Sequence, residues 1–491
     1  MTSLSTALAT SADPEVPAAQ PRDVRAAWTL AICCLLTYAW FYQGPGYNQH
    51  SHFATVRALV EHGTFEITRY VDTTGDVGVL PDGRVFSNKA PGLALWSAPA
   101  YFVLYHGERL LGRDPTGDAR LVVFNLYLLT VWGSALPATG CVVAISYYLR
   151  RRSGFNSGAA MLLAAVFAFG TLTLPYSGAM MAHNFVALCL FTAWMLLQRD
   201  TRAALLGTGA LLGVAVLVEH LTAPVVGIYL LALLLRRPTW RDVVAFCAGP
   251  AVAVGITLLY NAINFDKLLT TNHAYTAWSH ESRDLFMGAL GWPQPMRLYW
   301  ITIHPHRGLF YACPFLALAL LFPWSEARWR QLLRDHLVPL GVIVYFVLFN
   351  ISFSAWTGGW SVGPRYLIPS IPFLFVLATY AARRLPKVAS VLAVVSVSNM
   401  FTVAAVCLMV PTKDFGPPPP LDPIVECYRR LYSWHTISMH HGSFNLGLKM
   451  GMPGLTSLLP PLAVVIACFG LALRDPRRGR APAAPRALSP E

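Results

Sequence analysis

The sequence has few charged residues. Asp, Glu, Lys and Arg make up 12% of its 491 residues, compared with about 25% in soluble domains. Hydrophobic residues make up 55%, and the mean hydropathy is +0.48. Apolar stretches of span length, about 20 residues, recur from "AAWTLAICCLLTYAWF" (26–41) to "LLPPLAVVIACFGLAL" (458–473). This composition excludes a soluble domain and predicts an all-α, polytopic membrane helix bundle of about 12 to 13 spans.

Several functional signatures are also missing. The sequence contains no HExxH motif, no CxxC pair and no GxxxxGK[ST] phosphate loop, so it has no strong metal or nucleotide signature. Most of the nine cysteines lie inside apolar runs, which argues against a disulfide framework. Residues 1–25 lack the apolar region of a signal peptide and are expected to form a disordered cytoplasmic tail.

The net charge of +13 does not predict nucleic-acid binding, because the cations form no contiguous patch. Short basic clusters instead alternate with apolar runs. Such clusters mark the cytoplasmic face of a membrane protein. The clusters are Arg150 to Arg152; Arg199 and Arg202; Arg236, Arg237 and Arg241; Arg328, Arg330 and Arg334; Arg383, Arg384 and Lys387; and Arg474 to Arg480.

The segments between the basic clusters are rich in His, Trp, Tyr, Asn and Gly and are expected to be outer loops. The predicted organisation is a transmembrane core over 26–411 with outer loops at 44–91, 263–308 and 354–365, an outer loop over 412–455, a last span over 456–473 and a basic disordered tail over 474–491. One inconsistency follows. If 26–43, 92–111 and 121–149 each cross once, Arg150 to Arg152 end outside, so either 92–111 does not cross or the charge rule fails there.

The first outer loop is predicted to be structured. In "NQHSHFATVRALVEHG" the apolar residues recur with a helical period that ends at Gly63, which predicts a helix at the membrane surface. The following "DTTGDVGVLPDGRVFSNK" contains "PDG", which predicts a tight turn between short extended segments.

This loop also holds most of the candidate catalytic groups. It contains Glu61, Asp72, Asp76, His50 and Lys89. A carboxylate near a cation at a low-dielectric boundary can deprotonate an acceptor hydroxyl while the cation holds an anionic leaving group. The alternative is a solvated loop whose acids are turn residues. A divalent ion on His50 and His52 with Asp72 or Asp76 is possible but not favoured.

Two arginines start apolar runs further along the chain. Arg307 lies in "HPHRGLF" and Arg365 in "WTGGWSVGPRYLIP". A guanidinium can bind a phosphate with two hydrogen bonds, and neighbouring glycines let the backbone approach. The alternative is that these arginines anchor the chain at the membrane interface. This interpretation is less favoured for Arg365, because its segment carries more glycine than an anchor needs.

Four polar residues interrupt apolar segments and are candidates for a substrate cavity. His183 and Asn184 lie in "YSGAMMAHNF", and Glu219 and His220 lie between two halves of an apolar hairpin. A carboxylate in a membrane segment is a functional candidate because charge is costly there. For Glu219 and His220, structural anchoring of the hairpin is an equally good interpretation.

The order of these motifs resembles the GT-C superfamily, which includes the protein O-mannosyltransferases and the lipid A aminoarabinose transferase. The shared features are a first outer loop with a surface helix, then "NKAPG", then "YSGAMMAHNF" and a split hairpin, covering roughly residues 26–310. The resemblance implies that Lys89 contacts a donor phosphate. The family's early acidic residue is replaced by Asn48 and Gln49, so another base is required. Asp76 is the first candidate, followed by Glu61, Asp72 and His50.

The sequence therefore predicts an inverting glycosyltransferase of the cell inner or plasma membrane. It would move a sugar from a polyprenyl-phosphate donor to a lipid or cell-envelope acceptor at the outer face, with Lys89, Arg365 and Arg307 on the donor phosphate and no cofactor. The expected partners are the lipid-linked donor, the lipid or glycan acceptor and membrane lipids. The alternatives are a transporter or lipid-binding protein that kept the scaffold without the chemistry, and a structural assembly subunit.

Overall fold

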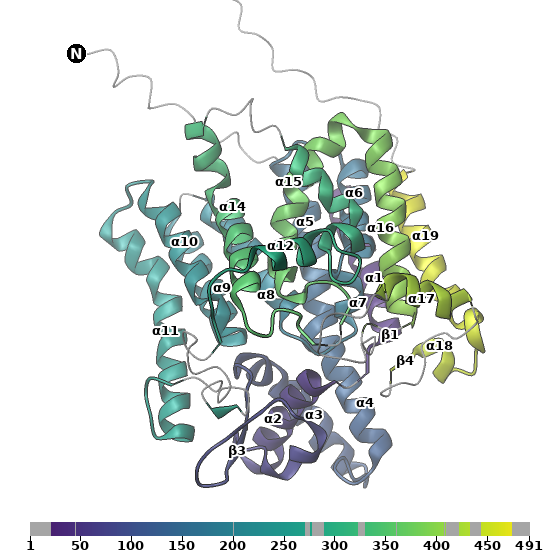
Figure 1. Ribbon diagram of the computed structural model, residues 1–491. Coiled ribbons are helices and arrows are strands. Elements are labelled where there is room, and N and C mark those ends of the chain that lie inside the picture. Colours follow the sequence, from purple (N-terminus) through teal and green to yellow (C-terminus); the bar gives the residue numbers. More distant parts are fainter. Residues whose placement is uncertain are drawn as a thin grey trace, which may run out of the picture.

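The computed structural model describes residues 21–44, 46–199, 201–270, 275–276, 289–322, 329–359, 361–406, 408, 422–432 and 443–473. The predicted tails at 1–25 and 474–491 lie mostly or wholly outside these ranges, as do parts of the loops predicted at 263–308 and 412–455. The described chain is an all-α bundle with two very short β-sheets (Figure 1). The fold class predicted from composition is confirmed.

The bundle is built from helices that are apolar on most sides. Among the described residues, five helical segments are long and apolar enough to cross a membrane, and six shorter helices of 10–17 residues are also apolar. The chain is therefore a multi-pass membrane protein. The helices of the bundle are α1 (Pro21–Trp40), α4 (Ala119–Thr130), α5 (Leu136–Arg151), α6 (Ser157–Gly170), α8 (His183–Leu197), α9 (Arg202–Val218), α10 (Ala223–Leu234), α11 (Trp240–Phe265), α14 (Trp329–Ser352), α15 (Ile371–Arg384), α16 (Pro386–Val406) and α19 (Leu459–Leu473).

Shorter elements connect these helices. They are α7 (Thr173–Ser177), η4 (His220–Thr222), α12 (Pro295–Thr302), α13 (Leu309–Ala312), η7 (Pro314–Leu321), η8 (Arg365–Ser370), α17 (Pro423–Tyr432), α18 (Leu446–Lys449) and η10 (Gly454–Leu458). A π-helical turn, η3 (Val131–Ala135), joins α4 to α5 without a break, so 119–151 is one segment of 33 residues.

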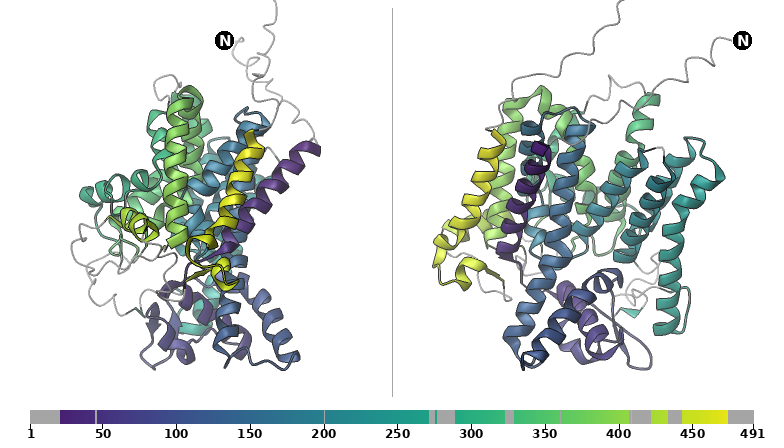
Figure 2. Two further views of the ribbon diagram at one scale, coloured as in Figure 1. Left: turned by 90° about the vertical axis from the view of Figure 1, so that its right-hand side faces the viewer. Right: turned by 180° about the vertical axis from the view of Figure 1, so that it is seen from behind.

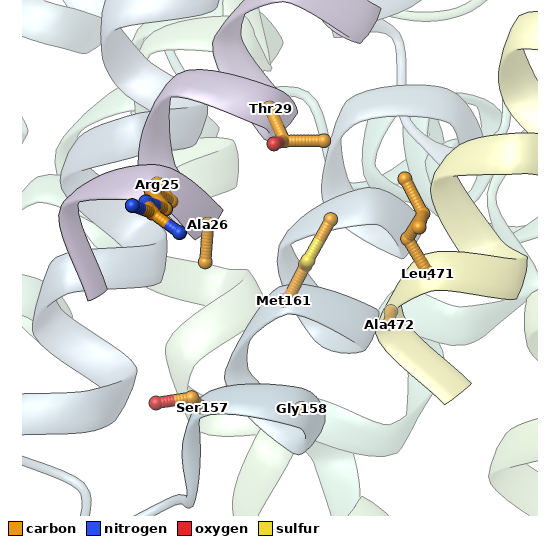
Figure 3. A pocket seen from close by; sticks show the side chains of 8 residues that line it. All are labelled: Arg25, Ala26, Thr29, Ser157, Gly158, Met161, Leu471 and Ala472. Carbon is orange, nitrogen blue, oxygen red and sulfur yellow. The ribbon is translucent and has the colours of Figure 1, made fainter. Parts of the chain in front are cut away.

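Several of the predicted basic clusters, among the residues that the structure describes, lie at one end of the bundle, here called the basic end. Arg25 and Ala26 of α1, Ser157 of α6 and Ala472 of α19 line one cavity of about 190 Å³ there (Figure 3). In Figure 2, α19 runs beside α1 and α6. The Arg383 guanidinium, at the end of α15, donates to the Ser153 carbonyl at 2.6 Å, which brings a second cluster to this end.

The first loop folds at the opposite end, here called the loop end. It contains α2 (Tyr47–His62), η2 (Thr68–Thr73) and a hairpin of β2 (Val77–Val79) and β3 (Val85–Ser87). Helix α2 ends at Gly63 in the left-handed conformation (φ 68°), the position that the period predicted. Ala54, Ala58, Ile67, Tyr70 and Val85 form a small core of the loop's own.

Helix α3 (Gly92–Leu110) settles the inconsistency over 92–111. It begins at the end of α9, packs on α2 and lies beside the first loop in Figures 1 and 2 instead of crossing the bundle. The segment 119–151 then ends at Arg151, which lies at the basic end. The start of α6, which follows it, lines the same cavity as Arg25. Arg150 to Arg152 thus lie at the basic end with Arg383, as the charge rule predicts, and the unit that the first loop forms includes α3.

Small residues allow the helices around the site to pack closely. A Cβ added to Gly209 of α9 would lie 2.0 Å from the Phe246 carbonyl oxygen of α11, and one on Gly213 would lie 2.5 Å from that of Gly249. Glycines spaced by four residues let helix backbones approach in this way in membranes. The pair α9–α11 thus forms a rigid support for the turn that follows α9.

The first and last spans are joined at the loop end. Strand β1 (Phe41–Tyr42) pairs antiparallel with β4 (Phe444–Asn445), with Phe41 opposite Asn445. The Trp40 indole donates to the Ser457 carbonyl at 3.0 Å. These contacts close the bundle between two segments that are 417 residues apart in sequence.

Candidate active site

The β2–β3 hairpin brings Asp76 next to Lys89. Val77 lies opposite Ser87, so the residues that flank the two strands meet at the open end of the hairpin. The Lys89 Nζ lies 2.9 Å from the Asp76 Oδ2. The Ser51 hydroxyl of α2 donates to the Asp76 carbonyl at 2.7 Å and lies 2.6 Å from the Ser87 hydroxyl. The loop helix therefore fixes both ends of the ion pair.

The Asp76 carboxylate is held in its charged form. Burial acts to raise the pKa of Asp76, but the charge and hydrogen bond of Lys89, helped by Arg365, outweigh it and lower that pKa below its usual value. The Asp76 and Lys89 side chains are 25% and 20% exposed, so water screens the pair only in part.

The segment that follows Lys89 packs on the end of α9. A Cβ on Gly92 would lie 2.4 Å from the Leu217 carbonyl carbon and 2.5 Å from the Val218 nitrogen, so only glycine permits this contact. Glu219 follows directly, in extended conformation (φ −152°, ψ 103°), between α9 and α10. The charges of Lys89 and Arg365 both act on its carboxylate. The predicted hairpin turn therefore faces the first loop.

Arg365 reaches the same group from the far part of the chain. It begins η8, and its guanidinium lies 5.2 Å from the centre of the Tyr366 ring. Gly358, with φ 68°, makes room for it, since a Cβ there would lie 3.0 Å from the Arg365 Nε. That buried Nε has no hydrogen-bond partner among the described residues. Its charge acts on Asp76 and Glu219, so Asp76, Lys89, Glu219 and Arg365 form one charged cluster.

Arg307 lies near this cluster but is engaged by the protein itself. The whole residue is 3% exposed, and its guanidinium donates to the backbone carbonyls of Gly359 and Ser361. Burial lowers the pKa of Arg307 to about 10, despite the opposing field of Tyr176. Arg307 therefore supports the glycine-rich link that leads to Arg365.

Two histidines border the cluster. His52 of α2 is buried, and burial together with the charge of Lys89 lowers its pKa to about 3, so the ring is neutral at neutral pH. The His183 ring lies edge-on to Tyr176 and Tyr366, 6.2 and 6.0 Å away, and the charge of Arg365 acts on it. Both rings lie beside the cluster, and that of His52 is neutral.

Other predicted site residues lie elsewhere or serve the fold. The Glu61 carboxylate accepts from Arg57, Tyr70 and Tyr101 at 2.7, 2.8 and 2.7 Å, so its oxygens are occupied. Asp72 is exposed on η2. Burial lowers the pKa of His50 on α2.

Three further positions that the sequence singled out are Asn184, His220 and Gln49. Asn184 donates to the Thr173 carbonyl at 3.4 Å. His220 starts η4, one residue beyond Glu219. Gln49, where the GT-C acid was expected, accepts from the Gly46 backbone N–H at 3.1 Å and so caps α2.

Sequence reasoning missed the groups that support the cluster. Ser51, Ser87, Tyr366 and Gly92 were not singled out as site residues, although Ser87 precedes Lys89 by only two positions. Their roles depend on contacts between distant segments. Within the described residues, no group of three or more His, Cys, Asp or Glu side chains could hold a metal ion.

Comparison with solved structures shows which fold this bundle shares. The chain is similar to ArnT from Cupriavidus metallidurans in the apo state and bound to undecaprenyl phosphate. Both matches have a TM-score of 0.51, with 16% and 15% identity, and cover 91% of this chain and 75% of ArnT. The Archaeoglobus fulgidus oligosaccharyltransferase in the apo form has a TM-score of 0.42 and 11% identity, over 80% of this chain and 57% of its own.

The chain shares the fold of ArnT, and this likeness agrees with the resemblance that the order of its motifs indicated. No protein-family model matches the sequence, and no curated protein matches it. The likeness to ArnT therefore rests on the fold.

Proposed function

We propose that this protein is an integral-membrane glycosyltransferase that uses a polyprenyl-phosphate sugar. The observation that carries the proposal is the cluster of Lys89 and Arg365 with two carboxylates, Asp76 and Glu219, at the loop end. The likeness to ArnT supports it, since one of the ArnT structures is bound to undecaprenyl phosphate. The acceptor would be a lipid or a cell-envelope glycan at the outer face.

In this proposal the two cations bind the phosphate that leaves the sugar. The Nζ of Lys89 and the unpartnered Nε of Arg365 would donate to phosphate oxygens and stabilise the charge that develops there. The acceptor hydroxyl would attack the anomeric carbon from the opposite side, which inverts the configuration. A carboxylate beside the cations would take its proton, and no metal is required.

Lys89 would supply one of the two charged donors to the leaving phosphate. Lys89→Ala should abolish transfer from labelled polyprenyl-phosphate sugars by the purified protein, because the phosphate loses a charged donor. Lys387→Ala, an exposed lysine at the start of α16, is the matched control and should leave turnover unchanged. Unchanged turnover in Lys89→Ala, with the protein still folded, would contradict the role.

A lipid-binding protein without chemistry is the second candidate. The observation that favours it is Gln49, which caps α2 where the superfamily usually has an acid. Such a protein would bind undecaprenyl phosphate through the same cations. Binding of the polyprenyl-phosphate sugar without release of sugar would identify it.

A further inference from the structure

We infer that the Glu219 carboxylate, not that of Asp76, takes the proton of the acceptor hydroxyl. This inference deepens the proposed function and depends on it. It assigns Asp76 to a different task, the positioning of Lys89.

Asp76 is poorly suited to accept a proton. One of its oxygens is 2.9 Å from the Lys89 Nζ, and the neighbouring charges hold its pKa below the usual value, which makes it a weak base. Its backbone carbonyl is bound by Ser51, which is itself bound to Ser87. The arrangement is that of a group that orients the lysine on the hairpin.

Glu219 has the same cations nearby but is not paired. Among the described residues its carboxylate has no Lys, Arg or His nitrogen within 4.0 Å, whereas seven other ion pairs are formed there. The charges of Lys89 and Arg365 act on it from a greater distance. A carboxylate that lies in the field of the two cations and has no direct ion pair can receive a proton.

The turn that carries Glu219 is rigidly placed. Gly92 packs directly on the backbone of Leu217 and Val218, which fixes the turn against the segment that carries Lys89. From the other side, the Tyr345 hydroxyl of α14 donates to the Leu221 carbonyl. A catalytic group has to be held in position in this way to act efficiently.

The transfer forms one bond and breaks one bond at the anomeric carbon. The acceptor oxygen forms a bond to the anomeric carbon as the bond from that carbon to the phosphate oxygen breaks. The electron pair of the broken bond stays on the phosphate, which Lys89 and Arg365 hold. The hydroxyl proton moves to the Glu219 carboxylate, which then releases it to water. The products are the glycoside and the polyprenyl phosphate.

The test compares Glu219→Gln with Asp76→Asn in the full-length protein reconstituted in nanodiscs. Glu219→Gln should bind undecaprenyl phosphate with an affinity within about twofold of the wild type but lose about 10²-fold or more in kcat. The acidic limb of its pH profile, where the wild type gains activity on deprotonation, should disappear. Asp76→Asn should mainly raise KM for the donor and weaken undecaprenyl-phosphate binding, with its acidic limb kept.

Asp82→Asn, on the exposed turn of the same hairpin, is the control and should behave as wild type. An active wild type with an equally active Glu219→Gln would overturn the assignment of the base but leave the proposed function intact. Loss of kcat and of the acidic limb in Asp76→Asn would also overturn it. A wild type that binds undecaprenyl phosphate but transfers no sugar would overturn both.

Discussion

Two ion pairs in the first loop show how similar residues acquire different tasks. The Arg57–Glu61 pair is 13% and 3% exposed, and two tyrosine hydroxyls complete the binding of its carboxylate. The Asp76–Lys89 pair is 25% and 20% exposed and lies in the field of Arg365. The first pair holds the loop together, and the second is open enough to meet a ligand.

Glu61→Gln should therefore destabilise the protein. It leaves the Arg57 guanidinium buried without its counter-charge, which costs roughly 3 to 5 kcal/mol. The expected result is a lower melting temperature of the purified protein in detergent. Asp82→Asn, which breaks the exposed pair with Arg84, should leave the melting temperature unchanged. Equal melting temperatures for Glu61→Gln and the wild type would contradict this structural role.

At this scale the sequence indicated part of the charged cluster. Lys89 and Arg365 stood out because each lies beside Gly and Pro at the start of an apolar run, and Asp76 because the first loop needed a carboxylate in place of the acid that Asn48 and Gln49 replace. The hydrogen bonds that occupy the Glu61 carboxylate could not be predicted, since one of them comes from the Tyr101 hydroxyl, 40 positions away in sequence. For the same reason the sequence could not distinguish a paired Asp76 from an unpaired Glu219.

Among the elements, α3 has the largest effect on the site. Its first residue, Gly92, touches the end of α9, and this contact sets the distance between the Lys89 segment and Glu219. Local signals predicted where α3 begins, because Pro91 and Gly92 interrupt the loop. They did not predict its direction, which depends on packing against α2.

Gly92→Ala should disturb both stability and activity. The added methyl would overlap the Leu217 and Val218 backbone, which must move at a cost of about 1 to 3 kcal/mol. We expect a lower melting temperature and a loss of transfer that is larger than the loss of stability explains. Gly107→Ala in the same helix meets no atom within 4 Å and should be neutral or slightly stabilising. Similar results for both variants would contradict the contact.

The whole molecule has one basic end and one loop end, which makes its orientation testable. Because α3 does not cross, residues on both sides of it should face the same compartment, opposite to Arg150 to Arg152. The charge rule alone left this open, because 92–111 is apolar and long enough to span.

Cysteines introduced one at a time at exposed positions can show on which side of the membrane each position lies. Asp72→Cys and Arg113→Cys should react with a membrane-impermeant maleimide added to intact cells, and Arg152→Cys should react only after the membrane is opened. Labelling of the unmodified chain gives the background. Protection of Arg113→Cys alongside reaction of Asp72→Cys would mean that α3 does cross.

The junction of β1 with β4, together with the bond from Trp40 to Ser457, has a consequence for biosynthesis. These partners are 417 positions apart, and a ribosome adds residues at about 5 to 20 per second, so Trp40 waits roughly 20 to 80 s for Ser457 to be made. During that time β1, which follows the first span, has no partner strand, and the Trp40 indole N–H lacks its acceptor. The bundle can be sealed only after β4 and Ser457 have been made, so a nascent chain that stops before β4 lacks its closing contact and is exposed to quality-control proteases.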